Sequence, residues 1–181
     1  MGKKVVGLAV LILVGGGLST FIYALTNNQV VIGYNQGYAP EQPIPFPHDL
    51  HAGPQYQINC QFCHSQVAET KHATVPSLNV CMNCHLGVQV RPEAQPLIDK
   101  ISAAYAAGES IAWQKVHLLP DHVKFNHASH IKAGKDCRVC HGPVEEMKVM
   151  YQWSSLSMGW CVNCHKQQEN NAPLNCSTCH Y

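Results

Sequence analysis

One short motif, repeated five times, accounts for every cysteine in this 181-residue chain. Each copy is Cys-x-x-Cys followed at once by histidine, so no cysteine is left for a disulfide. In chain order the copies are motif 1 (Cys60, Cys63, His64), motif 2 (Cys81, Cys84, His85), motif 3 (Cys137, Cys140, His141), motif 4 (Cys161, Cys164, His165) and motif 5 (Cys176, Cys179, His180). The pattern is the attachment signature of c-type haem, in which both thiols bond to the haem vinyl groups and the histidine binds the iron. The sequence therefore predicts five covalently bound c-type haems with these histidines as proximal ligands.

Two other uses of paired cysteines fit less well. A zinc site of four cysteines uses the pairs two at a time, which would leave one of five pairs over, and it needs no histidine after each pair. A redox-active thiol pair would need a thioredoxin-like βαβ context, which the sequence lacks. Charged residues are 13% of the chain, about half of the usual ~25%, which suggests that a partner or a cofactor covers part of the surface. The net charge of +1 gives no indication of nucleic-acid binding.

The N-terminal segment predicts a membrane anchor. Val5 to Leu25 contains no charged side chain, and a helix of this length would span ~31 Å, close to the ~30 Å hydrocarbon core of a bilayer. A cleaved signal peptide usually has a shorter apolar region of ~7–15 residues, and no clear Ala-x-Ala cleavage site follows here. We therefore expect residues 1–25 to be an uncleaved transmembrane helix.

The distribution of basic residues predicts the orientation of this anchor. Lys3 and Lys4 precede the apolar segment, whereas residues 26–70 contain no Lys or Arg. The positive-inside rule then places the N-terminus in the cytoplasm and the motifs on the periplasmic, outer face of the bacterial cytoplasmic (inner) membrane. That is also the side on which bacteria attach haem covalently.

The chain contains an internal duplication. A Phe-x-His-x-x-His segment precedes motif 1 and again motif 3, and near-constant offsets indicate two copies of one unit. The offsets are 79 residues for Phe46 to Phe125 and His48 to His127, 77 for Cys60 to Cys137, and 80 for Cys81 to Cys161. We therefore predict a tether over residues 26–45, a two-haem module over 46–90, a helical linker over 91–120 and a three-haem module over 121–181.

The predicted fold is mostly α-helical and irregular, with little sheet, because haems would take the place of an ordinary side-chain core. Within the linker, Pro96 suits the start of a short helix and Gly108 its end. Leu97, Ile98 and Ile101 fall on the apolar face of that helix.

Seven of the 12 histidines lie outside the motifs and are candidates for the second axial position of the irons. His48, His51, His127 and His130 are the strongest, because a spacing of three places both members of a pair on one side of a helical turn. His117 is either a fifth ligand or a contact to a haem propionate. Met147, Met150 and Met158 compete for the fifth position, and a His/Met haem would have a higher reduction potential than a bis-His haem. His72 and His122 are expected to be surface residues or neighbours of a site.

These motifs resemble the class III multihaem cytochromes c over roughly residues 44–181. Residues 116–127 (VHLLPDHVKFNH), residues 158–165 (MGWCVNCH), the ending CSTCHY and the single N-terminal span are similar to the pentahaem cytochrome c subunit of alternative complex III. That complex oxidises quinol and passes electrons to a cytochrome c or a terminal oxidase. The resemblance implies a hetero-oligomeric membrane complex, in which this subunit relays electrons from an iron–sulfur, molybdopterin-like subunit toward a monohaem cytochrome c. Related pentahaem chains also serve other molybdopterin and iron–sulfur membrane complexes.

The sequence thus favours an electron-relay subunit of a respiratory or photosynthetic quinol-oxidising complex, not an enzyme by itself. A stand-alone, anchored quinol dehydrogenase is the main alternative, but it would need a quinone site near the membrane, and residues 26–47 offer no obvious one. A multihaem enzyme such as a nitrite reductase would need an open iron position. All five motifs end in histidine, which counts against that reading.

Overall fold

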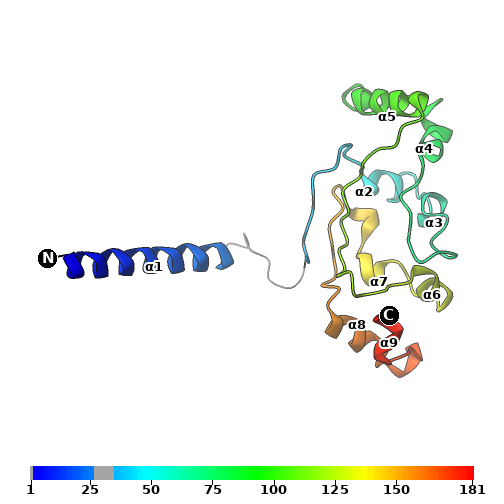
Figure 1. Ribbon diagram of the computed structural model, residues 1–181. Helices are drawn as coiled ribbons and strands as arrows, with labels where there is room; N and C mark the ends of the chain where they lie inside the picture. The colour runs from blue at the N-terminus through cyan, green and yellow to red at the C-terminus, as the bar shows by residue number, and fades with distance from the viewer. Residues whose placement is uncertain (1, 27–34) are drawn as a thin grey trace. The chain divides into compact units, whose positions relative to one another are not determined.

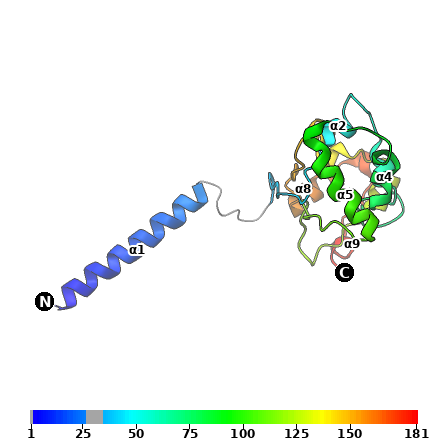
Figure 2. The same ribbon diagram turned by 90° about the horizontal axis from the view of Figure 1, so that it is seen from above.

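The computed structural model describes residues 2–26 and 35–181, which fall into two units (Figures 1 and 2). The first unit contains the helix α1 (Gly2–Thr26). Its segment Val5–Ala24 has a mean hydropathy of 2.4 and no buried side chain, so α1 is long and apolar enough to cross a membrane. The Ser19 and Thr20 hydroxyls donate to the Gly15 and Gly16 carbonyls, which satisfies them inside the helix. Part of the predicted tether, residues 27–34, lies outside the described residues.

The second unit, residues 36–181, contains short helices joined by irregular segments. The α-helices are α2 (His48–His51), α3 (Cys60–Cys63), α4 (Leu78–His85), α5 (Gln95–Ala107), α6 (His127–Lys132), α7 (Arg138–His141), α8 (Met158–His165) and α9 (Cys176–Cys179). Three 3-10 turns join them: η1 (Pro92–Ala94), η2 (Val144–Glu146) and η3 (Gln168–Asn170). The described residues form no β-strand, which confirms the predicted mostly helical, irregular fold.

The linker contains the longest helix of this unit. α5 carries a proline in its first turn and ends at Gly108, whose φ of 70° is a left-handed conformation that glycine adopts without strain. The predicted helix in the linker is therefore confirmed. Its apolar positions Leu97, Ile98 and Ile101 are half-buried, and α5 packs against α4.

Residues 36–44, in the second half of the predicted tether, pack on this unit. The Gly37 amide donates to the Gln152 carbonyl at 2.7 Å, and the Gln152 amide donates to the Tyr38 carbonyl at 3.0 Å. Farther along, Lys100 Nζ donates to the Pro43 carbonyl at 2.8 Å, which ties the segment to α5. The extended part of the chain before the first Phe-x-His-x-x-His segment is thus held by backbone hydrogen bonds.

The two copies of the repeat are interlocked. The helix α2 of the first copy packs on η2 of the second, and the Asp49 amide donates to the Met147 carbonyl at 3.0 Å. In return α6 of the second copy packs on the first, because the His127 amide donates to the Lys71 carbonyl at 3.2 Å. Each histidine-pair helix therefore lies against the other copy of the repeat.

Candidate haem-attachment sites and their histidines

The five motifs share a local geometry that follows from their spacing. In each motif, cysteines three residues apart lie on one side of a single helical turn, and the histidine follows at or just beyond its end. Side chains cap two of these turns: Asn59 accepts from the Gln61 amide before motif 1, and Ser157 accepts from the Trp160 amide before motif 4. All ten cysteines are free thiols, exposed or half-buried, and hence accessible for covalent bonding.

Three motif histidines have one ring nitrogen fixed by a backbone carbonyl. His64 Nδ1 lies 2.9 Å from the Thr74 oxygen, and His165 Nδ1 lies 2.8 Å from the Pro173 oxygen. His180 Nδ1 lies 2.9 Å from the His122 oxygen. A carbonyl only accepts, so Nδ1 carries the hydrogen and Nε2 keeps its lone pair. These rings are therefore in the tautomer that binds a metal through Nε2.

The histidine pairs of α2 and α6 have the same surroundings. Phe46 stacks on His51 with ring centroids 4.3 Å apart and meets His48 edge-on at 4.8 Å. Phe125 stacks on His130 at 4.4 Å and meets His127 edge-on at 4.8 Å. The duplication seen in the sequence is thus repeated in the side-chain packing.

Hydrogen bonds also fix the tautomer of two histidines in these pairs. Nδ1 lies close to a carbonyl oxygen in each: Pro47 for His51 at 2.9 Å and Asn126 for His130 at 2.8 Å. As in the motif histidines, Nε2 remains free to bind a metal. His127 Nδ1 has two neighbours, the Lys71 carbonyl oxygen at 3.0 Å and the Ala73 amide nitrogen at 3.3 Å, which favour opposite tautomers.

Several of these free rings face motif histidines at a common separation. Ring centroids are 6.3 Å apart for His51 and His85, 6.0 Å for His130 and His165, and 6.4 Å for His127 and His141. With two metal–nitrogen bonds of about 2 Å each, one iron between two imidazoles separates their centroids by roughly 6 Å. The spacing of the three pairs therefore fits an iron bound on both sides by histidine.

A fourth facing pair involves a histidine that we had predicted to be peripheral. The rings of His122 and His180 lie 5.6 Å apart and within 22° of parallel. The sequence contained a signal for this pair, since both His122 and motif 5 belong only to the second copy of the repeat.

His48 is the one member of the two histidine pairs that has no motif histidine facing it among the ring contacts described above. Burial, and then the positive charges of His64 and His51, lowers its pKa to about 4, so His48 is neutral at physiological pH. Its Nδ1 and that of His85 are buried with no hydrogen-bond partner among the described residues. Buried polar atoms are rarely left unpaired in a folded protein, so these two nitrogens differ from the Nδ1 atoms described above, each of which has a partner.

Interactions between cysteines of different motifs place the motifs in one row. Burial, and then the neighbouring Cys60, raises the pKa of the Cys137 thiol, so motif 1 is next to motif 3. Three other thiols have a pKa that is raised first by burial and then by cysteines of another motif. Cys81 and Cys84 of motif 2 raise the pKa of Cys63 in motif 1. Cys164 and Cys161 of motif 4 help to raise the pKa of Cys140 in motif 3 to about 11, and Cys179 of motif 5 raises that of Cys161 in motif 4. The order is therefore motif 2, 1, 3, 4, 5, and Figure 1 shows their helices α4, α3, α7, α8 and α9 following one another in this sequence.

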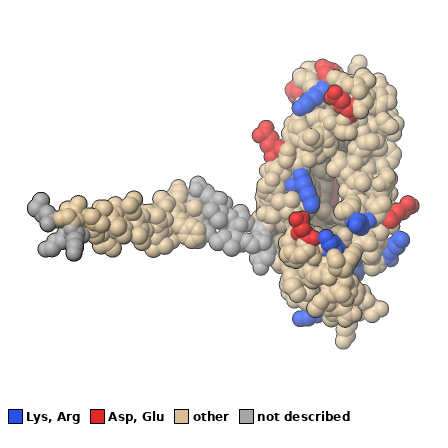
Figure 3. Space-filling model, viewed as in Figure 1, with Lys and Arg blue, Asp and Glu red and all other residues tan. Residues whose placement is uncertain are grey.

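The packing of the unit fits large apolar groups at these sites. Among the described residues, the buried apolar side chains are only Ile44, Val67, Met82, Ala128 and Met147. Large apolar side chains within or beside the motifs, such as Phe62 and Val139, are at least half-exposed. Figure 3 shows a recess in the face of this unit, with basic side chains near it. A haem beside each motif would cover such surfaces, and the free thiols and Nε2 atoms supply its attachment points.

The other sequence candidates have different surroundings. Met147 is buried, Met150 is half-buried, and Met158 is 69% exposed. His72 is exposed, and its backbone carbonyl accepts from the Thr70 hydroxyl. His117 Nε2 lies 3.1 Å from Nδ1 of the motif histidine His141, and the two rings meet edge-on with centroids 4.4 Å apart.

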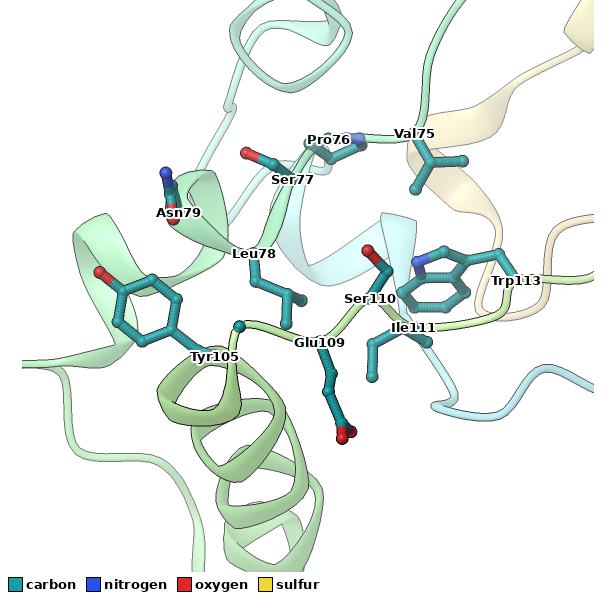
Figure 4. Close-up of a pocket in the computed structure, with 11 residues that line it drawn as sticks. Val75, Pro76, Ser77, Leu78, Asn79, Tyr105, Glu109, Ser110, Ile111 and Trp113 are labelled. Carbon is teal, nitrogen blue, oxygen red and sulfur yellow. The ribbon is translucent and has the colours of Figure 1, made fainter.

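A pocket of about 430 Å³ lies between the start of α4 and the end of α5. Tyr105 and Trp113 lie on opposite sides of it with Leu78 between them, and the Glu109 side chain points away from Leu78 (Figure 4). No motif cysteine or histidine lines this pocket.

The repeated attachment motif and its geometry are typical of the multihaem cytochromes c, which transfer electrons through covalently bound c-type haem. Residues 123–181 match the model of the family described as cytochrome c7 and related cytochrome c. The chain is similar to the multiheme cytochrome c subunit of menaquinone reductase from Nitratidesulfovibrio vulgaris, at 27% identity over 165 residues that cover 77% of each chain. It is also similar to the high-molecular-weight cytochrome c of the same organism, at 26% identity over 145 residues. That match covers 69% of this chain but only 26% of the relative.

Proposed function

We propose that this protein is a pentahaem electron relay, in which each of the five motifs holds one haem through its two cysteines. When bound, each c-type haem supplies a one-electron carrier. The chain's own residues hold and orient these groups. The carbonyls of Thr74, Pro173 and His122 keep the hydrogen on Nδ1 of His64, His165 and His180, so that Nε2 would be free to bind the iron.

The second axial ligands follow from the facing rings. We assign His51 to the iron of motif 2, His130 to motif 4, His127 to motif 3 and His122 to motif 5. His48, the remaining histidine of the two pairs, is assigned to motif 1 by elimination, because the other four motifs have a facing ring. These five assignments use no methionine.

The single row of motifs carries the relay proposal. A row in the order 2, 1, 3, 4, 5 has two ends, one at α4 and one at the C-terminal helix α9. An electron that enters at one end can leave at the other without a motif being bypassed. Such an arrangement serves two partners at a distance from each other, as the subunit of a larger complex requires.

The comparison with a menaquinone reductase subunit supports a hetero-oligomeric membrane complex as the setting. Within it, the relay would link an iron–sulfur, molybdopterin-like subunit to a monohaem cytochrome c or another terminal acceptor, as in alternative complex III. We infer that α1 anchors the chain in the cytoplasmic membrane with the motifs on the periplasmic face. Replacing residues 1–26 by a cleavable secretion signal should release a soluble protein with its haems. If this variant stayed in the membrane fraction when its partner subunits were absent, α1 would not be the membrane anchor.

Quinol oxidation by this chain alone is less well supported by the site. The pocket between α4 and α5 has Tyr105 and Trp113 on opposite sides, but no histidine lines it (Figure 4). Its lining has one carboxylate, that of Glu109, whose side chain points away from Leu78. We therefore place quinol oxidation in another subunit of the complex.

The proposal is tested by counting haems and ligands in the purified full-length chain. Haem content should be five per chain, and changing both cysteines of motif 5 to alanine should reduce it to four. Electron paramagnetic resonance (EPR) should show only low-spin haems at rest, and His130→Ala should convert one of them to high spin. A wild-type chain with fewer haems, or one with a resting high-spin haem that binds substrate, would rule out the pure relay.

A further inference from the structure

Among the four motif histidines whose Nδ1 has a hydrogen-bond partner, one differs from the others in the group that accepts the hydrogen. For motifs 1, 4 and 5 the partner is a backbone carbonyl, whereas for motif 3 it is the imidazole of His117. The distance from His141 Nδ1 to His117 Nε2 is 3.1 Å. This contact joins residues 24 positions apart, so it does not result from the local geometry of the motif.

The direction of this hydrogen bond follows from the role of His141. If His141 binds iron through Nε2, its Nδ1 carries the hydrogen, so His117 Nε2 must accept. His117 then carries its own hydrogen on Nδ1. The edge-on contact at 4.4 Å leaves no room for an iron between these two rings, whereas His127 faces His141 at 6.4 Å. His117 is therefore placed as a hydrogen-bond partner of the proximal ligand and not as its opposite ligand.

A buried amide holds the segment that carries His117. The next residue, Leu118, donates its amide hydrogen to Gln152 Oε1 at 3.2 Å. Gln152 is fully buried, and its Nε2 donates to the Ser154 carbonyl at 3.1 Å. The position of His117 is thus set by a side chain with little freedom to move.

We propose that His117 is a positioning residue for the haem of motif 3, which it influences through the hydrogen bond from His141. This inference rests on the proposed function, because it requires His141 to be the proximal ligand. A ligating histidine that donates its second N–H becomes more basic and binds the iron more strongly. Hydrogen bonding around the ligand is one of the means by which a protein sets a haem potential.

Motif 3 is the middle of the row, with motifs 1 and 2 on one side and motifs 4 and 5 on the other. Every electron that crosses the full row must pass this position. His117 therefore acts on the central haem, where a change of potential affects transfer in both directions.

The test compares His117→Phe, which keeps a planar ring but has no acceptor, with His117→Gln, whose amide oxygen can still accept from His141. The full-length chain in detergent is titrated potentiometrically, and each low-spin haem is followed by EPR. His117→Phe should shift the g-values of one haem and raise its potential, because a less basic ligand stabilises the ferric state less. His117→Gln should restore much of the wild-type signal. His117→Leu provides a second variant without an acceptor if the phenylalanine does not fit.

Two results would overturn the inference. If His117→Phe leaves all potentials and g-values unchanged, His117 has only a structural role. If it produces a high-spin haem, His117 is an iron ligand and the assignment of His127 is wrong. The proposed function fails separately, if the wild-type chain carries fewer than five haems or if His141→Ala leaves all low-spin signals intact.

Discussion

Phe125 stacks on His130 with ring centroids 4.4 Å apart and an interplanar angle of 28°. The equivalent residues of the first repeat, Phe46 and His51, stack at 4.3 Å and 23°. A stacked aromatic ring limits rotation of the imidazole about its side-chain bonds, and a hydrogen bond from Nδ1 to a carbonyl fixes the ring from the other direction. The two contacts together hold Nε2 in one orientation.

Removing the stacking ring should disturb a single haem. In Phe125→Leu the apolar side chain remains but the ring contact, worth about 0.5–1.5 kcal/mol, is lost. We expect a broadened or split EPR signal for the haem of motif 4 and a small loss of stability. Phe46→Leu should give the same effect on a different haem, that of motif 2. If both variants altered the same signal, our assignment of His51 and His130 to different irons would be wrong.

His122 and His72 form a matched pair, because both are exposed histidines outside the motifs. Only His122 faces a motif histidine, His180, with ring centroids 5.6 Å apart. His122→Ala should therefore convert one haem to high spin, whereas His72→Ala should leave the spectrum unchanged. Resonance Raman spin-state markers provide the measurement. A low-spin spectrum in His122→Ala would return the fifth position to Met147, Met150 or Met158.

Gly142 and Gly134 differ in what an added Cβ would meet. Both have a positive φ, 71° and 72°, so alanine is strained at either position, and the ψ of −166° places Gly142 in a region that essentially only glycine adopts. A Cβ at Gly142 would also overlap the indole ring of Trp153, whereas a Cβ at Gly134 has no atom within 4 Å. Gly142→Ala should therefore lower the thermal unfolding midpoint more than Gly134→Ala, because overpacking costs a further ~1–3 kcal/mol in the free energy of unfolding. Equal midpoints would show that Trp153 moves aside without cost.

Gln152 and Gln42 offer a comparison of buried and exposed amides. Gln152 is fully buried and its side chain bonds to Leu118 and Ser154, so Gln152→Leu leaves an amide and a carbonyl unpaired. We expect a loss of about 1–3 kcal/mol in the free energy of unfolding by urea. Gln42 bonds to Gln114 in both directions, but solvent reaches these bonds. Gln42→Leu should cost markedly less, because water replaces the lost partners. A similar loss in both variants would contradict the structural role given to Gln152.

Much of the local structure could be predicted from the sequence, because it depends on residues close together in the chain. A Cys-x-x-Cys-His segment needs only one helical turn to bring two thiols to one side, and all five motifs form such turns. The histidine pairs lie on the predicted turns α2 and α6, and Gly108 ends α5 as expected. The N-terminal apolar segment forms a helix long enough to cross a membrane, and the duplication reappears as matching contacts of Phe46 and Phe125.

The order of the motifs in space, by contrast, depends on contacts between distant parts of the chain. Chain order alone would place motif 2 next to motif 3, but the contact between Cys60 and Cys137 places motif 1 there. The reason is the interlocking of the two repeats, in which α2 packs on η2 and α6 on residues near Lys71. Spacing in the sequence contains no information on that packing.

The sequence by itself determined the class of cofactor, the anchor-like helix and the two repeats, since each depends on residues of one continuous segment or on direct comparison of segments. Only the tertiary structure decided which histidines face one another. His122 lies 58 residues from His180, and His117 lies 24 residues from His141, yet one faces its partner at a separation that can hold an iron and the other touches its partner directly. The difference arises because the segment before α6 packs on distant parts of the chain: the Leu118 amide donates to Gln152, and the Lys124 amide donates to the Cys179 carbonyl. Such contacts do not follow from the local sequence pattern.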